Sequence, residues 1–417
     1  MRGRELYEKL VKRIEGYRDY AVELETALTA IPALAPPRGE GECKKAEYLV
    51  SHLKELGVSE IQEYDAPDDR VPCGHRPNVV ARIPGEDRSR TVWFMAHMDV
   101  VDPGNLENWD SDPWTVRVEG DKIFGRGVED NQQGLVSSMC LVKALKEEGA
   151  TPPCDLGILL VADEETGNGY GISYLLGQHQ IFGKNDIIVV PDGGLPDGTQ
   201  IEVAEKGIVW FEFTVRGKQC HASTPDVGVN AHRAAAHLVV QLESLYERFD
   251  ASDPVFDPPR STFEPTLHRE NVKSTNVIPG DEVFHLDCRV LPNYELGEVK
   301  VAVDEICKKV AQKFTKSDEL ACTITWKAIQ EEAAAPATPV DAPVVTALKK
   351  GVQEVYGVEA KPEGIGGGTV AAFIRKMGYP AAVWARMDET MHSPNEYALL
   401  SNVIGDSKVF AHVLAHV

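Results

Sequence analysis

Apolar residues in the first quarter of the chain change from helical to strand spacing. Between Glu5 and Thr29 they recur at every third or fourth position, which predicts one amphipathic helix. A Pro-rich stretch, Ile31 to Pro37, ends it. A second helix is expected over about residues 41–56. Short runs rich in β-branched residues then predict three strands, at about residues 61–64, 78–83 and 91–97. This alternation favours an α/β fold.

Three apolar strand runs are each followed by polar residues of the kind that bind metals. The first ends in His97-Met-Asp99, the run 155–162 is followed by Asp163-Glu164-Glu165, and the run 187–190 is followed by Pro-Asp192. A single His-x-Asp is commonly a satisfied core histidine, and consecutive acids commonly face solvent. The carboxyl ends of parallel strands, however, open onto one crevice of a sheet. Repetition on three strands therefore favours a functional site.

Two further segments contribute residues of the same kind. Asp130 stands between glycines just before a helix expected over about 135–148, and His392 lies in Met391-His-Ser-Pro-Asn-Glu396. The alternative for the segment around Asp130 is a solvated turn. Two imidazoles and three carboxylates suit a pair of ions such as zinc, and a carboxylate that is not a ligand can take a proton from zinc-activated water. That chemistry hydrolyses amides.

From Gly207 the spacing indicates a different domain. The expected order is strand, helix, strand, strand, helix, strand, over about residues 209–216, 230–249, 261–270, 281–291, 297–314 and 321–329. This is the order of a small ferredoxin-like α+β domain. An Ala/Pro-rich segment that begins at Glu332 is predicted to be the linker from the inserted domain back to the larger domain. We expect residues 1–206 and 331–417 to form one catalytic domain, a mainly parallel sheet with helices on both faces, and residues 207–330 to be inserted into it.

Length, charge and cysteine content limit the kinds of protein and of binding partner that the sequence suggests. A chain of 417 residues exceeds the usual size of a single core. Its formal charge of −22 argues against nucleic acid or anionic membrane as partners. No apolar run is long enough for a membrane span, and no secretory signal is seen, so we expect a cytoplasmic protein. Eight cysteines without a Cys-x-x-Cys pair predict buried reduced thiols, and neighbouring Cys220 and His221 point to opposite faces of a strand, which disfavours a catalytic dyad.

These motifs together resemble the dinuclear-zinc family that contains acetylornithine deacetylase, succinyl-diaminopimelate desuccinylase, aminoacylase, glutamate carboxypeptidase and the bacterial di- and tripeptidases. The similarity extends from about Asn78 to the C-terminus. It implies two Zn²⁺ per chain, for which cobalt or manganese can substitute. The roles it implies are His97 and Asp192 for one ion, Glu165 and His392 for the other, Asp130 as the bridge, Asp99 as the acid that orients His97, and Glu164 as the general base.

The resemblance also covers the inserted domain, which it implies is a lid and dimerisation domain of a homodimer. His221, in Gly217-Lys-Gln-Cys-His-Ala-Ser-Thr-Pro, resembles the histidine that stabilises the tetrahedral intermediate, across the dimer in some members. Asn276 and Arg289 match residues that grip a substrate carboxylate. Gly367, Gly368 and Thr369 match a loop that lines the pocket. A cis peptide between Asp130 and Asn131 is a further expectation from the family.

Some positions depart from the family pattern. Lys is frequent where Gln132 or Gln133 stands, and Asp where Val370 stands. Asp192 has a shorter side chain than the Glu of many deacylases and resembles the peptidase branches. The polar loop 102–114 contains Trp109 and Trp114, which either contribute to the site or anchor the loop.

The sequence thus predicts a zinc-dependent hydrolase of an amide bond in a small amino-acid derivative, such as an N-acyl amino acid deacylase or desuccinylase. A di- or tripeptidase, or a carboxypeptidase with the same mechanism, is the alternative. A second hypothesis, of a different functional class, is that the protein binds metal without catalytic activity. The presence of Glu164 argues against this hypothesis. Phosphoryl transfer is disfavoured because no basic phosphate clamp accompanies the expected ligands.

Overall fold

The computed structural model describes residues 2–417, which form two compact units. The first unit comprises residues 2–203, Thr338–Glu363 and Thr369–Val417. The second unit comprises Ala204–Ala337 and Gly364–Gly368. Each unit has its own sheet and its own buried apolar cluster.

An eight-stranded sheet organises the first unit. Its four central strands run parallel to one another, in the order β6-β3-β7-β16, and antiparallel strands flank them. In spatial order the strands are β1 (Glu60–Pro67), β2 (His75–Ile83), β6 (Cys154–Val161), β3 (Asp87–His97), β7 (Ile187–Val190), β16 (Ala381–Val383), β8 (Gln200–Glu205) and β15 (Lys361–Ile365). The predicted mainly parallel α/β sheet is confirmed.

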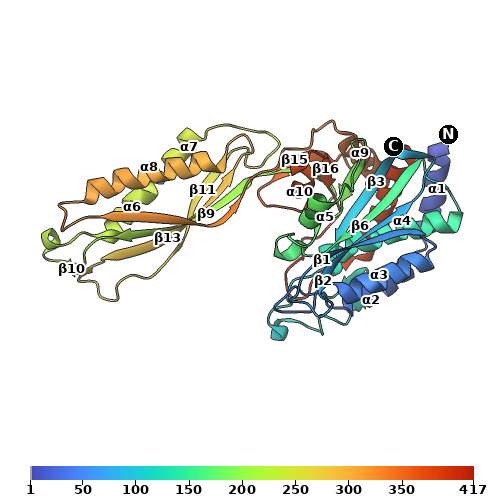
Figure 1. Cartoon of the computed structure of the whole chain (residues 1–417), viewed down its shortest axis with the longest axis horizontal. Helices are drawn as coiled ribbons and strands as arrows, with labels where there is room; N and C mark the ends of the chain where they lie inside the picture. The colour runs from blue at the N-terminus through green and yellow to red at the C-terminus, as the bar shows by residue number, and fades with distance from the viewer. Residues whose placement is uncertain (1) are drawn as a thin grey trace. The chain divides into compact units, whose positions relative to one another are not determined.

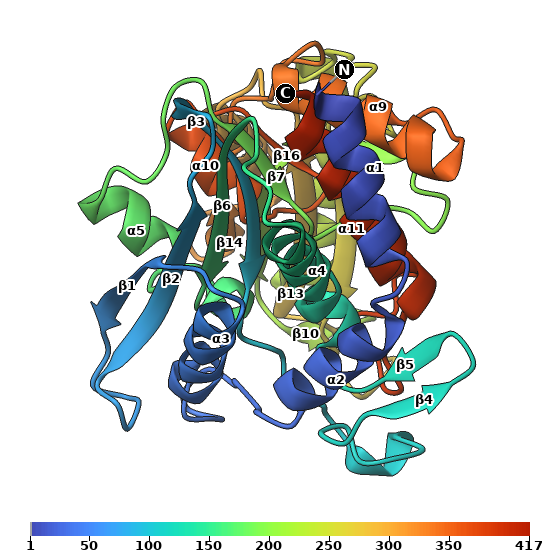
Figure 2. The same cartoon turned by 90° about the vertical axis from the view of Figure 1, so that its right-hand side faces the viewer.

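Successive residues of β3 are buried on opposite faces of this sheet, because strand side chains alternate. Phe94 stacks on Phe410 of α11, at 4.5 Å between ring centroids, whereas Trp93 and Met95 join the apolar cluster that includes residues of α5 and α10. Figure 2 shows helices on both sides of the sheet. The helices of this unit are α1 (Arg2–Ile14), α2 (Arg18–Thr29), α3 (Cys43–Glu55), α4 (Gln133–Glu148), α5 (Ile172–Gln178), α9 (Pro343–Tyr356), α10 (Ala371–Lys376) and α11 (Leu400–His416).

Some elements differ from the sequence expectation. The single opening helix is wrong, because the chain breaks into α1 and α2 at a tight turn in which the N–H of Gly16 donates to the carbonyl of Arg13. Strands β8 and β15 were not predicted. β15 contains Pro362 and Gly364, both unfavourable in a strand, so tertiary pairing outweighs its local propensity. A small sheet of β4 (Arg117–Glu119), β5 (Lys122–Phe124) and β17 (Tyr397–Leu399) completes the unit.

The second unit is built on a four-stranded antiparallel sheet in the order β11-β13-β9-β14 (Figure 1). Its main elements follow the chain as strand, helix, strand, strand, helix, strand. Phe211, Phe213 and Leu286 lie in a core closed by apolar residues of two helices, α6 and α8. The bounds are β9 (Gly207–Arg216), β10 (Cys220–His221), α6 (Ala231–Leu242), α7 (Ser244–Arg248), β11 (Thr262–His268), β12 (Val277–Ile278), β13 (Asp281–Val290), α8 (Leu296–Phe314) and β14 (Thr323–Glu332).

The cysteines depart in part from the expected reduced thiols. Cys43, at the start of α3, and Cys73, in the loop before β2, form a disulfide across a Cα–Cα distance of 6.8 Å. The expectation is wrong for these two, because the fold brings together residues that are 30 positions apart. The other six cysteines of the described chain are free, and five of them are buried.

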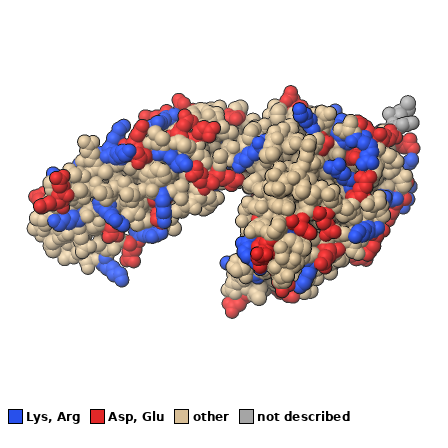
Figure 3. Space-filling view, viewed as in Figure 1, with Lys and Arg blue, Asp and Glu red and all other residues tan. Residues whose placement is uncertain are grey.

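Two further features of the described residues are the distribution of charge on one face and the apolarity of the helices. On the face shown in Figure 3, basic side chains are interspersed with acidic ones. Among residues 2–417, no helix is both long enough and apolar enough to cross a membrane.

Gly157 on β6 offers a test of the packing beneath the site. A Cβ at this position would lie 2.2 Å from the buried ring of Trp93 on β3. Gly157→Ala should therefore lower the free energy of unfolding by about 1–3 kcal/mol, as overpacking does. Chemical denaturation measures the change. Gly177→Ala, in helix α5 with no atom within 4 Å of the added methyl, is the matched control and should be neutral or slightly stabilising. Equal stabilities of the two variants would contradict this packing.

Candidate metal centre and active site

The three strand ends expected to carry the site lie side by side in the sheet. β3 ends at His97, which pairs in parallel register with Val161 at the end of β6. β7 ends at Val190, two residues before Asp192, and lies on the other side of β3. The acids that follow β6 and β7 therefore emerge beside His97, as parallel strands require.

Asp130 lies at the centre of the cluster. Its Oδ1 is 2.9 Å from Nε2 of His97, and its Oδ2 is 2.9 Å from Nε2 of His392. The peptide bond between Asp130 and Asn131 is cis, as expected. His392 comes from a loop between β16 and β17 and has a positive φ of 59°, which is uncommon for a residue other than glycine. One carboxylate thus faces two imidazoles from segments 295 residues apart in the sequence.

The remaining predicted acids complete the two sides of this arrangement. Oε2 of Glu165 is 3.2 Å from Nε2 of His392, and Oδ1 of Asp192 is 3.6 Å from Nε2 of His97. The Asn131 amide donates to Oδ1 of Asp192. Donor atoms of His97, Asp130 and Glu165 lie within 4.8 Å of one another, and so do those of His97, Glu164 and Asp192. All seven predicted residues of this centre, His97, Asp99, Asp130, Glu164, Glu165, Asp192 and His392, belong to the first unit.

Asp99 connects the end of β3 with the loop after β6. Its two carboxylate oxygens accept the backbone N–H groups of Glu164 and Glu165, at 3.1 and 3.0 Å. Nδ1 of His97 lies 3.0 Å from the backbone oxygen of Asp99 and 3.5 Å from its Oδ1. With oxygens on the Nδ1 side, Nε2 is the nitrogen that faces the acids. Asp99 therefore fixes both the imidazole and the backbone of the two glutamates.

Burial dominates the electrostatics of this cluster. It raises the pKa of the Glu164 carboxyl to about 8 and also raises the pKa of Glu165 and Asp192. Hydrogen bonds with Asp130 and Glu165 raise the pKa of His392 to about 10. Asp130 is buried too, yet its bonds to the two imidazoles lower its pKa. The raised pKa values of Glu164, Glu165, Asp192 and His392 indicate that additional positive charge at this cluster would be favourable.

These residues fit a metal pair by their own chemistry. Oε1 of Glu165 is buried and has no hydrogen-bond partner, which is costly for a carboxylate oxygen. Imidazole nitrogens and carboxylate oxygens are the ligands that zinc accepts. An ion beside one oxygen of Asp130 would lie near His97 and Asp192, and an ion beside the other oxygen would lie near His392 and Glu165.

Two glutamates that the sequence analysis did not identify tie the segments of the centre together. The Glu129 carboxylate accepts the backbone N–H groups of Asp388 and Thr390 and the Thr390 hydroxyl, in the loop that carries His392. The Glu396 carboxylate accepts the N–H groups of Gly127, Glu129 and Asp130, at 3.0, 3.0 and 3.1 Å, and pairs with Arg126. Both side chains are buried. Glu129 directly precedes Asp130 and Glu396 lies four residues after His392, but neither position has a pattern that marks a buried carboxylate.

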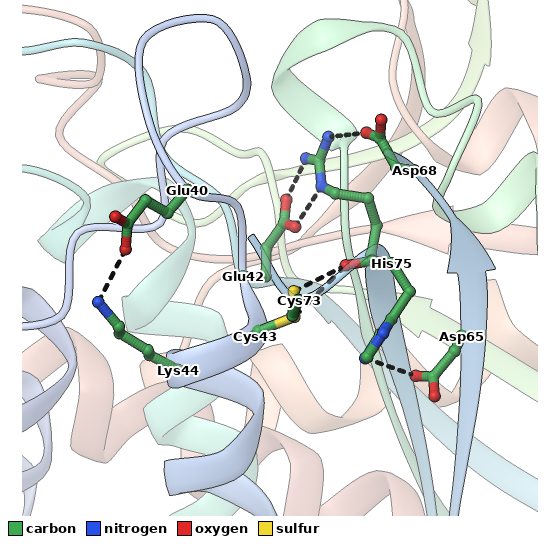
Figure 4. Close-up of a disulfide and its surroundings, with 9 residues drawn as sticks. Glu40, Glu42, Cys43, Lys44, Asp65, Asp68, Cys73 and His75 are labelled. Carbon is green, nitrogen blue, oxygen red and sulfur yellow. Dashed lines mark hydrogen bonds and ion pairs between the residues drawn. A yellow bond between two sulfur atoms is a disulfide. The ribbon is translucent and has the colours of Figure 1, made fainter. Parts of the chain in front are cut away.

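A second buried network supports the loop before Glu164. Glu42 receives two hydrogen bonds from the Arg76 guanidinium and accepts the backbone N–H of Asp163 at 3.2 Å. Figure 4 shows Glu42 next to the Cys43–Cys73 disulfide. Nη1 of Arg76 also lies 3.6 Å from Oδ2 of Asp68. Asp163 has a φ of 61°, a conformation that its neighbours must hold in place. Glu42 and Arg76 lie far from the motifs, so no local pattern indicated them.

The residues expected to contact substrate belong mostly to the second unit. His221 lies on β10 opposite Val277 of β12, and its Nδ1 is 2.7 Å from the Ser223 hydroxyl. The backbone carbonyl of Asn276 accepts the N–H of Ala222 at 2.9 Å. Arg289 forms two hydrogen bonds to Asp287. Its Nη1 also donates to the carbonyl of Gly366, which adjoins Gly367 and Gly368. Thr369 belongs to the first unit, where its hydroxyl donates to Glu202.

The positions that depart from the family pattern have structural partners. Gln133 donates to the carbonyl of Arg386 and to Asp406, and Val370 packs in the apolar cluster of the sheet. Trp109 is buried, donates to the carbonyl of Pro103, and lies under the Arg126 guanidinium. For Trp109 these contacts favour the anchoring alternative.

Comparison with known proteins places this chain in a family. The model of peptidase family M20/M25/M40 matches residues 93–416. An uncharacterized metallohydrolase of Methanococcus maripaludis is 38% identical over 413 residues, which cover 95% of this chain and 99% of that protein. The succinyl-diaminopimelate desuccinylase of Magnetococcus marinus is 25% identical, over 94% of this chain and 97% of its own.

Solved structures show the same fold. Human carnosine dipeptidase 1 superposes with a TM-score of 0.72 at 18% identity, over 98% of each chain. A dipeptidase of Saccharomyces cerevisiae superposes with a TM-score of 0.70 at 18% identity, over 100% of this chain and 98% of its own. The chain belongs to peptidase family M20/M25/M40 and is a metal-dependent hydrolase that acts on amide bonds.

Proposed function

We propose that this hydrolase removes the acyl group from a small N-acylated amino acid. The observation that carries the hydrolytic part of the proposal is Asp130, whose two oxygens each lie 2.9 Å from an imidazole while the half-buried Glu164 lies in the same cluster. Similarity to a succinyl-diaminopimelate desuccinylase over 94% of the chain supports this substrate class. So does the similarity to the acetylornithine deacetylase of Dictyostelium discoideum, which is 24% identical over 94% of the chain.

The proposed cofactor is a pair of zinc ions, with cobalt or manganese as substitutes. His97 and Asp192 would hold one ion, Glu165 and His392 the other, and Asp130 would be shared between them. When bound, such ions polarise a carbonyl and lower the pKa of water. The buried, unpartnered Oε1 of Glu165 is consistent with a ligand position.

Glu164 is the proposed general base. Its carboxylate would accept a proton from the attacking water and pass it to the nitrogen of the leaving amine as the C–N bond breaks. Asp99 would hold this base in place, since it binds the backbone N–H groups of Glu164 and Glu165. The role of Asp99 is therefore to orient the base and His97.

Substrate recognition is assigned in this proposal to the inserted lid and dimerisation domain, residues 207–330, and to the loop Gly367-Gly368-Thr369. Arg289 and Asn276 would grip the substrate carboxylate, for which the planar guanidinium is suited. His221 would stabilise the tetrahedral intermediate, within its own chain or across a homodimer. The cytoplasmic location stays a prediction, and the Cys43–Cys73 disulfide counts against it, since disulfides are rare in cytosolic proteins.

A di- or tripeptidase, or a carboxypeptidase, is the second candidate. The specific observation in its favour is Asp192, because its shorter side chain resembles that of the peptidase branches. The same centre would serve either substrate, since both reactions cleave an amide.

The role of Glu164 can be tested by Glu164→Gln. The amide cannot accept the proton, so kcat should fall at least ~10²-fold while the metal content per chain is unchanged. Steady-state kinetics and elemental analysis measure the two quantities. Glu107→Gln, at an exposed carboxylate of a surface loop, is the control and should retain activity. Unchanged turnover in Glu164→Gln would remove the general-base role.

The substrate class can be tested with a panel of metal-loaded assays. N-succinyl and N-acetyl amino acids, dipeptides and tripeptides are compared in the presence of zinc, cobalt or manganese. We expect kcat/KM to be at least ~10-fold higher for the best acylated amino acid than for the best peptide, a difference of about 1.4 kcal/mol in transition-state stabilisation. The opposite order would establish the peptidase candidate instead.

The two glutamates that join the loops can be tested by Glu396→Gln and Glu129→Gln. In each variant an amide N–H₂ would face backbone N–H groups, so hydrogen bonds would be lost. Glu396→Gln would weaken those that hold Asp130, and Glu129→Gln those that hold the loop of His392. We expect metal affinity to fall about 10–100-fold, as for other residues that orient ligands. Competition with a metal buffer gives the affinity. Glu25→Gln is a matched control, since Glu25 is equally buried and its carboxylate oxygens have no hydrogen-bond partner. Equal losses in all three variants would mean that the effect is not specific to the loops.

A further inference from the structure

A second group of metal-ligating side chains lies in the second unit. It consists of His232, in the first turn of α6, His268, at the end of β11, and Glu282, near the start of β13. One potential ligand atom from each lies within 4.8 Å of the others. None of the three belongs to the centre described above or to the residues assigned to substrate.

Strand register explains why the three side chains meet. His268 pairs with Phe284, and paired residues project to the same face of a sheet. Glu282 lies two residues before Phe284 and shares that face. Phe284 is buried in the cluster that includes residues of α6 and α8, so this is the helix-covered face. His232 reaches it from the first turn of α6.

The chemistry of the group is that of a metal site that is closed on one side. The Glu282 side chain is 0% exposed, whereas the side chains of His232 and His268 are 59% and 51% exposed. A buried carboxylate flanked by two accessible imidazoles provides three ligands and leaves a fourth position open to water. Zinc commonly binds two histidines, one carboxylate and water.

The two carboxylate oxygens of Glu282 differ in their hydrogen bonding. Oε2 lies 2.9 Å from Nδ1 of His232 and accepts the amide of Asn271. Oε1 is buried and lies against Nε2 of His268 as an ion pair, with no hydrogen-bond partner. The 2.9 Å separation of imidazole and carboxylate equals the one that Asp130 makes with His97 and His392. The group thus has the same ligand types as the main centre and shares one imidazole–carboxylate separation with it.

We propose that His232, His268 and Glu282 bind one divalent ion of the zinc class. The ion would link the first turn of α6 to the end of β11, which is an edge strand with a register shift between Pro265 and His268. At this end of β11, the Arg269 N–H donates to the Val283 carbonyl of β13 at 3.0 Å. An ion bound by one side chain from each of α6, β11 and β13 would stabilise this end of β11.

The test is the zinc content of the full-length chain after equilibrium dialysis against a zinc buffer. The double variant His232→Gln/His268→Gln should hold one ion per chain fewer than the wild type, with kcat within about 2-fold of it. His237→Gln, also on α6 but outside the group, is the matched control and should keep the wild-type content. Asp130→Asn should lose ions at the main centre and retain the ion of the second unit, so failure at one site is distinguishable from failure at the other.

A second measurement avoids dependence on how the variants fold. Crystals of the wild type soaked in zinc should show an anomalous peak among the three side chains. A peak there, with the loss of one ion in the double variant, supports the site. Equal zinc content in the wild type and the double variant, or no peak in the soaked crystal, would overturn it.

Discussion

The first unit depends on how a buried cluster of carboxylates is kept in place. Asp130, Glu165 and Asp192 come together at one edge of the sheet, where their mutual repulsion and desolvation oppose folding. Two imidazoles offset part of this cost, since Asp130 has His97 on one oxygen and His392 on the other. A pair of divalent ions, as proposed, would offset the rest. We therefore interpret the cluster as a binding site for cations.

Hydrogen bonds from backbone N–H groups to buried carboxylates position this cluster. Asp99 binds the N–H groups of the two glutamates after β6, Glu396 binds the N–H groups around Asp130, and Glu129 binds the loop that carries His392. In each case a buried carboxylate from one loop satisfies the amides of another. Loops of irregular conformation can be buried in this way without leaving polar groups unpaired. The side chains of the proposed centre are thereby held in place by hydrogen bonds although they lie on loops.

The sequence predicted the parallel sheet and the convergence of acids on it, because apolar strand runs followed by polar residues are a local signal. It could not predict the break at Gly16, which depends on a single turn, or β15, whose proline and glycine oppose a strand. The carboxylates of Glu129 and Glu396 went unassigned because a buried glutamate that binds backbone amides has no sequence signature. Glu42 and Arg76 depend on tertiary contacts between distant segments. The Cys43–Cys73 disulfide was missed for the same reason.

The most direct test is a crystal structure of the zinc-loaded protein with anomalous data at the zinc edge. Two peaks about 3.5–4 Å apart are expected, one on each side of the Asp130 carboxylate, with His97 and Asp192 at one and Glu165 and His392 at the other. A structure with no zinc at this edge of the sheet, or with zinc that does not contact Asp130, would contradict the proposed centre and the hydrolytic mechanism built on it.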